Sequence, residues 1–326
     1  MIISRTPLRI SFVGGGTDLA VFYKKETGEV ISTAVNKYMY VSVNKRFDDS
    51  IRLSYTKTEI VDNVEDLQHE LVKEAMKLTG VTKGVEITTV ADIPAKGTGL
   101  GSSSSLTVGL LNALYAYKGK RVATRRLAEE ACKIEIDIVG EPIGKQDQYI
   151  AAYGGIKHFY FKQNNSVVVE PLLVSGRRIK KLQENLMLFY TQINRSAHSV
   201  LKEQKANSSN KLEELRSLKG LVPGLKNCFE KESSRLDEFG EILHRGWQVK
   251  KTLASNITND VIDRYYQKAM NAGAIGGKIL GAGGGGFLLL YCHKEYQRKV
   301  KEALKPLRQV AFEFEPEGSR IIYADY

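Results

Sequence analysis

The sequence predicts an α+β protein of two domains. Short runs of β-branched and apolar residues alternate with amphipathic helical segments in the first half, and a strand, several helices and a closing group of strands follow in the second. A length of 326 residues suffices for two hydrophobic cores of ordinary size. The polar, basic stretch 176–181 has the composition of a domain junction, so we predict one domain over 1–180 and another over 181–326.

In the first half, period-two alternation indicates strands, and apolar residues at helical spacing indicate helices. Met39, Val41 and Val43 alternate with more polar neighbours in one strand, and Gly80 marks the end of the first helix. The predicted strands are 7–13, 38–46, 85–91, 156–161 and 167–172, and the predicted helices are 66–78, 102–117 and 124–138, the last with Thr124 as its N-cap.

The second half is expected to open on an apolar strand over 186–191 and to continue with helices near 234–253 and 259–271. Strands follow at 278–280, 286–292, 309–314 and 319–323, with a helix near 294–304 among them. No internal repeat or long low-complexity tract interrupts this order, so each domain is expected to have an ordinary globular core.

The composition excludes several classes of protein. Hydrophobic residues make up 42% and charged residues 26%, the balance of a soluble globular chain, and no apolar run approaches the ~20 residues of a membrane-spanning helix. The N-terminus lacks the features of a signal peptide, so we expect a cytoplasmic protein with no membrane partner. Cys132, Cys228 and Cys292 lie far apart, which argues against a disulfide framework or zinc site and favours buried thiols.

The net charge of +11 is the one unusual feature of the composition. No nucleic-acid motif accompanies the basic residues, so we expect no nucleic-acid partner. A positive field also attracts ATP and phosphorylated metabolites, although a merely soluble basic surface accounts for most of these residues.

The most specific local signal is the segment PAKGTGLGSSSS at 94–105, between a predicted strand and a predicted helix. Its three alternating glycines allow the backbone to approach an anion closely. Its serines fall on the first helical turn, where free N–H groups and the helix dipole favour phosphate. The segment lacks the Gly-Lys-Ser/Thr of a Walker A loop. A glycine turn with a serine N-cap is the alternative, but the segment has more glycines and serines than a cap requires.

Two further glycine clusters are less specific. The loop GAGGGG at 281–286 formally matches GxGxxG, but a predicted strand follows it instead of the helix of a dinucleotide-binding fold. Its glycines indicate a close backbone approach to a ligand or between two domains. The cluster GGGTD at 14–18 suits recognition of sugar hydroxyls by Asp18, and a tight turn capped by Thr17 or Asp18 is an equal alternative.

Two carboxylates, Glu135 and Asp147, bracket a predicted helix end and the loop after it. Phosphoryl transfer needs a carboxylate to hold Mg²⁺, and usually a second one to orient or deprotonate the attacking hydroxyl. Each acid taken singly is more commonly a solvated surface charge. Motifs of zinc proteases, α/β-hydrolases and protein kinases do not occur in the sequence.

Together, and in this order, these segments resemble the motifs of the GHMP kinases, which include galactokinase, homoserine kinase, mevalonate kinase and phosphomevalonate kinase. PLRISFVGGGTD resembles the first motif, Pro94 to Ser105 the second and Lys278 to Phe287 the third. Four residues instead of three separate Pro94 from Gly99, which departs from the second motif. The resemblance implies a domain like ribosomal protein S5 up to about residue 180, a ferredoxin-like domain after it, and an active site in the cleft between them.

The resemblance also implies roles for individual residues. Asp147 corresponds to the catalytic aspartate of the family, and Arg9 to a catalytic basic residue that stabilises charge near the transferred phosphoryl group. Ser103 and Glu135 would hold Mg²⁺. The residues expected to contact ATP are Pro94, Lys96, Gly97, Thr98, Gly99, Leu100, Gly101, Ser102, Ser103 and Ser104, and those expected to contact the substrate are Gly14, Gly15, Gly16, Thr17, Asp18, Gly283 and Gly284.

A departure in the first motif indicates the substrate. Galactokinases have Glu-His where this chain has Gly15 and Gly16, so galactose itself is not expected. The form VGGGTD and the stretch around Tyr190 resemble D-glycero-D-manno-heptose 7-phosphate kinases. Those enzymes phosphorylate the anomeric hydroxyl of a heptose 7-phosphate on the way to nucleotide-activated heptose.

We therefore expect an ATP- and Mg²⁺-dependent kinase whose partner is a small-molecule sugar phosphate. The charged far end of that substrate would need a cation, and Lys96, Arg195 and His198 are candidates. One alternative is a kinase for another sugar, such as fucose or mannose, or for an alcohol such as mevalonate or homoserine. Another is a catalytically silent sugar sensor of the same fold. A homodimer is a candidate assembly that the sequence leaves open.

Overall fold

The computed structural model describes residues 1–94, 97–193, 203 and 211–325. Within these ranges eight strands form a large sheet and four form a smaller one, with helices packed on both, so the predicted α+β class is confirmed. The strands of the large sheet are β1 (Ile2–Val13), β2 (Gly28–Lys45), β3 (Ile51–Ser54), β4 (Thr58–Val61), β5 (Val85–Ala91), β6 (Ile156–Phe161), β7 (Val167–Pro171) and β12 (Arg320–Ala324).

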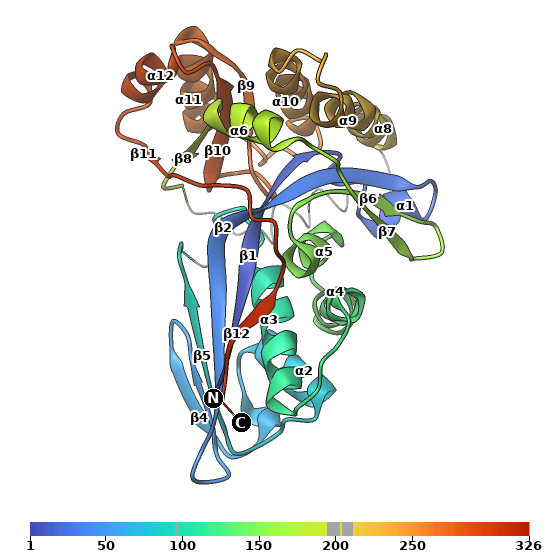
Figure 1. Ribbon diagram of the computed structural model, residues 1–326, viewed down its shortest axis with the longest axis vertical. Coiled ribbons are helices and arrows are strands. Elements are labelled where there is room, and N and C mark those ends of the chain that lie inside the picture. The colour runs from blue at the N-terminus through green and yellow to red at the C-terminus, as the bar shows by residue number, and fades with distance from the viewer. Residues whose placement is uncertain (95–96, 194–202, 204–210, 326) are drawn as a thin grey trace.

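The large sheet has the order β12-β1-β2-β5-β3-β4, with β6 paired to β2 and to β7. Its pairs are antiparallel except for β3 with β5. β1 and β2 are longer than predicted because they pair with each other from Ile2↔Val43 to Val13↔Ile31. That long pairing carries β1 from the large sheet to the second half of the chain, as Figure 1 shows.

Five helices accompany the large sheet: α1 (Ala20–Tyr23), α2 (Glu70–Thr79), α3 (Ser102–Tyr117), α4 (Thr124–Cys132) and α5 (Gln146–Tyr153). Two short helical turns, Val64–Asp66 before α2 and Lys133–Ile138 after α4, complete this part. α3 is buried along nearly its whole length against β1 and β2 on one side and α2, α4 and α5 on the other. This enclosure is the reason that α3 is apolar on more than one face.

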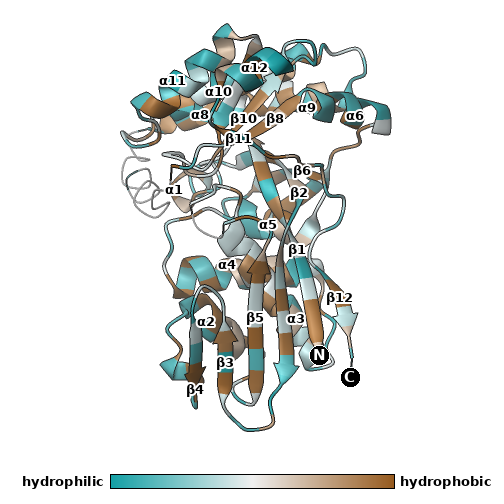
Figure 2. Ribbon diagram, turned by 90° about the vertical axis from the view of Figure 1, so that its left-hand side faces the viewer, coloured by the Kyte–Doolittle hydropathy of each residue, from teal (hydrophilic) through white to brown (hydrophobic). Residues whose placement is uncertain are grey.

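The smaller sheet is antiparallel and has the order β11-β8-β10-β9. Hydrophobic residues run along strands in both sheets, and hydrophilic residues are frequent on the outer helices (Figure 2). The strands are β8 (Leu186–Tyr190), β9 (Ala274–Ile279), β10 (Phe287–Cys292) and β11 (Arg308–Gln309), and the helices are α6 (Gly176–Glu184), α8 (Leu212–Gly220), α9 (Val222–Glu230), α10 (Asp237–Lys250), α11 (Asp260–Asn271) and α12 (Gln297–Ala303).

A shared hydrophobic core joins the two halves. Phe12, near the end of β1, packs edge-on against Phe239 of α10 with ring centroids 5.2 Å apart. Phe229 of α9 contacts both rings, at 5.8 and 5.6 Å. All three side chains are almost completely buried. Because this contact fixes the end of β1 against the second half, it also fixes the loop that follows β1.

The stretch 176–181, which was predicted as a junction, lies in α6, so any junction here is helical. The Ser175 hydroxyl caps this helix by accepting from the Arg178 backbone N–H. The Arg178 side chain is buried and donates to the carbonyls of Cys228, Glu232 and Ser234. A basic residue within the predicted junction therefore holds α6 against α9.

Other predicted elements differ mainly at their ends. The helix expected from 66 begins at Glu70, and the strand expected over 309–314 forms a ladder only at Arg308–Gln309. The chain beyond it runs beside β2, where Glu315 N–H donates to the Ala34 carbonyl. β12 then pairs with β1 in the large sheet, so the two ends of the chain lie together in Figure 1. We propose a division of the chain into two domains near residue 180. β12, from the end of the chain, returns to the sheet of the first domain.

Among the described residues, no helix has the length and apolar character needed to cross a membrane.

Candidate active site

The glycine-serine loop connects β5 to α3. Gly97, Gly99 and Gly101 have φ of +73°, +74° and +75°, a left-handed conformation that glycine adopts without steric cost. Gly101 is the N-cap residue of α3, so the serines that follow occupy its first turn as predicted. Pro94 lies exposed before the loop, and Lys96 lies outside the described residues. The loop therefore presents backbone N–H groups at a helix N-terminus, which is a favourable site for phosphate.

The second glycine loop packs directly on the first. A Cβ atom on Gly99 would lie 2.4 Å from the Leu280 carbonyl oxygen, and one on Gly281 would lie 2.4 Å from the Gly99 Cα atom. Gly286 approaches the Thr98 carbonyl equally closely. The sequence predicted that this loop approaches either a ligand or the other domain. The structure shows a close backbone approach between the two halves of the chain. Gly281 and Ala282 line the pocket described below.

Gly283 and Gly284, which we expected at the substrate, contact Ile257 instead. A Cβ on Gly283 would lie 2.8 Å from the Ile257 carbonyl oxygen, and the Gly284 N–H donates to the same oxygen at 2.7 Å. Neither residue is among those that line the pocket beside Gly281. Their expected contact with substrate stays a prediction.

Glu135 lies against the start of α3. Its carboxylate accepts hydrogen bonds from Ser103 Oγ and Ser104 Oγ, both at 2.7 Å, from Thr107 Oγ1 at 3.2 Å, and from Gln148 Nε2. The side chain is fully buried, and this burial raises the pKa of its carboxyl although the hydroxyl donors lower it. Ser103 is the exposed member of the pair of serines, whereas Ser104 is buried.

Oxygen ligands of this kind suit Mg²⁺, which prefers carboxylate and hydroxyl oxygens supplemented by phosphate and water. The Glu135 carboxylate has only neutral partners among the described residues, so a cation at Ser103 would compensate its buried charge. The described residues contain no cluster of three or more metal-ligating side chains. The chain would therefore supply only part of the coordination shell, as is usual when phosphates complete it.

Arg9 of β1 and Asp147 of α5 form a bidentate ion pair. Arg9 Nε donates to Asp147 Oδ1 at 2.7 Å, and a terminal guanidinium nitrogen donates to Oδ2 at 2.6 Å. The remaining guanidinium nitrogen donates to the Gly99 carbonyl in the glycine-serine loop. The side chain of Arg9 is 6% exposed and that of Asp147 is 22% exposed, so the aspartate is the more accessible partner. The pair thus lies between the loop and the pocket, with both groups fixed in position.

Asp18 follows β1 and is held by backbone donors. The Gly16 N–H donates to its Oδ1 at 2.9 Å, and the Gln146 N–H to its Oδ2 at 3.3 Å. Burial and the neighbouring Asp147 charge raise the pKa of this carboxyl. A Cβ atom on Gly144 would lie 2.0 Å from Asp18 Oδ2, so Gly144 must be glycine for the carboxylate to fit.

Thr17 has a structural role in the same loop. Its hydroxyl donates to the carbonyls of Gly14 and Glu29 and accepts from the Glu29 N–H at 3.0 Å. Gly14, Gly15, Gly16 and Asp18 line the pocket, but Thr17 does not. The two interpretations of this cluster therefore apply to different residues: Thr17 stabilises the turn, and Asp18 faces the pocket.

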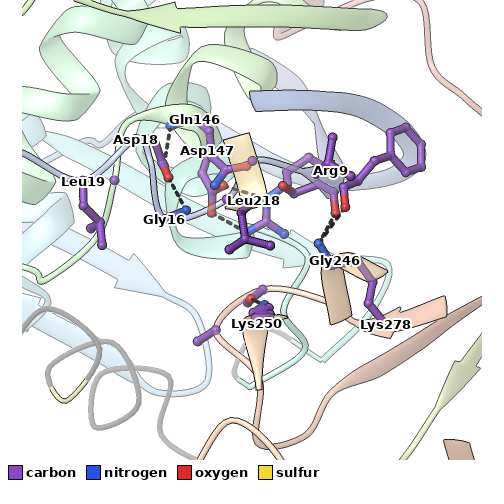
Figure 3. A pocket seen from close by; sticks show the side chains of 18 of the residues that line it. Arg9, Gly16, Asp18, Leu19, Gln146, Asp147, Leu218, Gly246, Lys250 and Lys278 are labelled. Atoms are coloured by element: carbon purple, nitrogen blue, oxygen red, sulfur yellow. Dashed lines mark hydrogen bonds and ion pairs between the residues drawn. The ribbon is translucent and has the colours of Figure 1, made fainter. Parts of the chain in front are cut away.

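One pocket brings most of these groups together. On what we call its aspartate side lie Arg9, Asp18 and Asp147, and on its lysine side lie Lys250 and Lys278. Figure 3 shows Arg9 and Asp147 above Lys250, which comes from the end of α10. The other residues that line the pocket are Ser11, Phe12, Val13, Gly14, Gly15, Gly16, Leu19, Ile143, Gly144, Gln146, Leu218, Gly246, Gly281 and Ala282.

The two lysines are functional candidates that the sequence analysis did not name: Lys278 begins the third motif, and Lys250 lies in no motif. Lys278 Nζ donates to the carbonyls of Ser11 and Phe12, both at 2.9 Å, and Lys250 Nζ donates to the Gly281 carbonyl. Burial and neighbouring positive charges lower the pKa of both, that of Lys250 to about 7. A sequence signal did exist for Lys250, since it continues the apolar stripe of Phe239, Leu243 and Trp247 at helical spacing, where a charge has no structural reason to lie.

Ser11 and Gln146 add neutral polar groups to the pocket. Ser11 Oγ and Gln146 Oε1 are buried and have no hydrogen-bond partner among the described residues. A Cβ atom on Gly15 would lie 3.6 Å from both side chains. A larger residue at position 15 would therefore extend toward these two groups, and glycine leaves that space to a ligand. Arg195 and His198, the other cations that we predicted, lie outside the described residues.

A second hollow lies beside the glycine-serine loop, and Ser102 and Ser103 are part of its wall. Its other walls come from β2, β5, α2 and the first turns of α3, and they combine apolar side chains such as Met39 and Leu106 with polar ones such as Gln68. The whole site thus consists of this hollow, the glycine-serine loop, the paired Arg9 and Asp147, and the pocket that contains Lys250, in that order.

Known protein families and structures resemble this chain over most of its length. Residues 66–155 match the family described as GHMP kinases N terminal domain, and residues 221–307 match the family described as GHMP kinases C terminal. Together the two matches span more than half of the chain.

The chain is 29% identical over 323 residues to a D-glycero-alpha-D-manno-heptose 7-phosphate kinase of Campylobacter jejuni, and the alignment covers 93% of each protein. It is 26% identical to a galactokinase of Pyrococcus furiosus, over 93% of this chain and 92% of the relative. The crystal structure of a D-glycero-D-manno-heptose 1-phosphate kinase from Bacteroides thetaiotaomicron superposes over both whole chains with a TM-score of 0.82 and 24% identity, which shows a shared fold.

Proposed function

The chain belongs to the GHMP kinase family of ATP-dependent kinases, and we propose that its substrate is D-glycero-D-manno-heptose 7-phosphate. In the proposed reaction the anomeric hydroxyl oxygen forms a bond to the γ-phosphorus of ATP, and the bond from that phosphorus to the bridging β–γ oxygen breaks. The products are the 1,7-bisphosphate, ADP and the proton of the hydroxyl. The sugar 1-phosphate so formed is the kind of product from which nucleotide-activated heptose is made.

The observation that carries the proposal is the Arg9–Asp147 pair between the glycine-serine loop and the pocket. Asp147 would orient the sugar hydroxyl and accept its proton, and Arg9 would stabilise charge on the transferred phosphoryl group. Because the two side chains hold each other in place, neither needs to reorganise during the reaction. Asp18 would accept hydrogen bonds from other sugar hydroxyls, as its position in the pocket wall suggests.

ATP would bind with its phosphates along residues 97–104 and its base in the hollow that shares Ser102 and Ser103 with the loop. Mg²⁺ would be held by Ser103 and Glu135, whose oxygen atoms and unpaired negative charge fit it. When bound, the metal would neutralise charge on the phosphates of ATP. Pro94 and Lys96 stay predicted contacts of the nucleotide.

The identity of the acceptor rests on two supports. The heptose 7-phosphate kinase of Campylobacter jejuni matches this chain over nearly its whole length. Gly15 keeps side-chain atoms out of the pocket beside Ser11 and Gln146, which suits a substrate larger than a hexose. The galactokinase relative keeps another sugar as the second candidate, with fucose and mannose in the same group.

An ADP-release assay with Mg-ATP tests the proposal directly. We would measure turnover of heptose 7-phosphate, mannose, fucose, galactose, mevalonate and homoserine, each at the same concentration. The expected result is the highest kcat/KM for heptose 7-phosphate. Preferential turnover of galactose would refute the substrate, and no turnover of any compound despite ATP binding would favour a silent sensor.

A further inference from the structure

The lysine side of the pocket carries basic groups that no acidic residue of the described chain neutralises. The hydrogen-bond acceptors of Lys250 and Lys278 within the described ranges are all carbonyl oxygens. On the aspartate side, by contrast, Arg9 and Asp147 neutralise each other. Three cations and two carboxylates therefore face one buried pocket, and the excess is positive. A buried charge without a counter-ion is unfavourable, so the pocket is built to be completed by an anion.

Lys250 has donor capacity directed into this pocket. One of its three N–H bonds is used by the Gly281 carbonyl. Its side chain is fixed because α10 packs on β9 and Trp247, one turn before it, is completely buried. Lys278 is less available, since two of its donors are used by Ser11 and Phe12. It therefore lies behind Lys250 as a second basic group whose orientation is fixed by these two carbonyls.

A second observation also indicates a ligand. Ser11 Oγ is buried in the wall of the same pocket and has no hydrogen-bond partner in the part of the chain that the structure describes. The carbonyl of the same residue accepts a hydrogen bond from Lys278. A buried hydroxyl without a hydrogen bond costs about 1–3 kcal/mol unless a ligand or water satisfies it. Phosphate oxygens can accept from both an ammonium group and a hydroxyl, which a carbohydrate hydroxyl does less strongly.

We propose that Lys250, supported by Lys278, is the phosphate-binding residue on the lysine side of the pocket. This proposal deepens the proposed function and rests on it for the identity of the acceptor. Two sources could supply the phosphate group: the acceptor sugar phosphate or the γ-phosphate of ATP. The γ-phosphate is a candidate because Lys250 is close to the glycine-serine loop. Lys250 donates a hydrogen bond to the Gly281 carbonyl, and Gly281 packs against Gly99 of that loop.

The neighbouring lysine provides a matched control. Lys251 is partly exposed, and its Nζ lies 3.5 Å from Asp263 on α11, away from the pocket lining. Lys250→Met and Lys251→Met therefore make the same chemical change one residue apart. Lys250→Arg keeps the positive charge but changes the shape of the side chain. Comparing it with Lys250→Met therefore distinguishes the effect of charge from the effect of shape.

Steady-state kinetics would be measured with heptose 7-phosphate and with the same heptose lacking the phosphate. If Lys250 binds the acceptor phosphate, Lys250→Met raises KM for heptose 7-phosphate about 30-fold or more and leaves the phosphate-free sugar unaffected. If it binds the γ-phosphate, kcat/KM falls by a similar factor with both acceptors. Both results support a phosphate site and identify its source. Equal kinetics for Lys250→Met and Lys251→Met would overturn it.

A binding measurement keeps the test independent of the acceptor. Inorganic phosphate would be titrated at constant ionic strength onto the protein saturated with Mg-ADP, which occupies the glycine-serine loop, and Tm would be recorded. We expect phosphate to raise Tm of the wild type, Lys250→Arg and Lys251→Met, and to leave Lys250→Met unchanged. A wild-type response that Lys250→Met retains in full would contradict the site. If no sugar is turned over but this difference is seen, the proposed substrate fails and the phosphate site stands.

Discussion

The two sides of the pocket hold their charges in different ways. On the aspartate side, Arg9 and Asp147 form a bidentate pair, and backbone N–H groups hold Asp18. On the lysine side, Lys250 and Lys278 donate only to carbonyl oxygens among the described residues. A carbonyl orients an ammonium group without neutralising it. The aspartate side is therefore complete before ligand binds, whereas the lysine side needs an anion to complete it.

This contrast separates two requirements of phosphoryl transfer. Groups that act on the transferred phosphoryl group must be prepositioned, because reorganisation during the reaction would raise the barrier. A charged group that has no counter-ion in the free protein can give selectivity for a charged substrate. The phosphate of that substrate then supplies an interaction that uncharged sugars cannot. Substitutions on the aspartate side, on the lysine side, or in the glycine loops between them can therefore be expected to have different effects.

The largest effect is expected on the aspartate side, from Asp147→Asn. The amide cannot accept the hydroxyl proton and no longer neutralises Arg9, so we expect kcat to fall about 10³-fold. ADP binding, measured by calorimetry, should change little because Asp147 does not line the hollow beside the loop. The exposed Asp137→Asn is the matched control. A kcat within threefold of the wild type would contradict the role of Asp147.

Gly99→Ala tests the contact that joins the two sides. Its Cβ would meet the Leu280 carbonyl at 2.4 Å and would also require φ of +74°, so we expect a loss of about 2–4 kcal/mol in the free energy of unfolding. Gly119 has φ of +68° and nothing within 4 Å of its would-be Cβ. Gly119→Ala should therefore cost only about 1 kcal/mol, from backbone strain alone. Equal losses in urea denaturation would show that the contact between the loops is unimportant.

The residues on the aspartate side of the pocket are easier to predict from the sequence than those on its lysine side. Arg9, Asp18 and Asp147 were all predicted, and the structure brings them to one pocket because β1 and α5 meet there. The predicted GHMP kinase fold is confirmed. These residues lie in short motifs whose glycines constrain the backbone, so local sequence identifies them.

The lysine side could not be predicted in the same way. Lys250 stands out in the apolar stripe of α10, but only the packing of that helix against β9 places the lysine in the pocket. The same limit explains α6, where burial of Arg178 depends on carbonyls more than 50 residues further along the chain. The pairing of β12 with β1 joins opposite ends of the sequence. Contacts between distant segments are not encoded in local patterns.

Glu135→Gln should give a smaller effect than the first two changes. The amide keeps the shape of the side chain but removes the charge that would hold Mg²⁺, so we expect activity to fall about 10- to 100-fold at limiting Mg²⁺. Excess Mg²⁺ should restore part of the activity. Glu129→Gln, on an exposed residue paired with Arg125, is the control. An unchanged Mg²⁺ dependence would exclude Glu135 as a ligand.

The smallest effect is expected on stability, from Lys250→Met in the absence of ligand. Burial and Arg9 lower the pKa of Lys250 from 10.5 to about 7, although Asp147 and Asp18 oppose the shift, and Lys278 is a further neighbouring charge. Between pH 7 and 10.5 the unfolded chain binds more protons at this site than the folded one, so the wild type loses stability as pH falls through this range. The cost of the buried charge is complete below pH 7.

Methionine removes that cost but leaves the Gly281 carbonyl without its donor. We therefore expect Lys250→Met to raise the free energy of unfolding by about 1–2 kcal/mol more at pH 6.5 than at pH 9, as measured by urea denaturation at both pH values. Lys251→Met should show no such difference, since Lys251 is partly exposed and paired with Asp263. If Lys250→Met is more stable than the wild type but no longer binds phosphate, Lys250 serves ligand binding and not stability. A pH-independent effect of Lys250→Met would mean that this lysine is already neutral, or already paired, in the free protein.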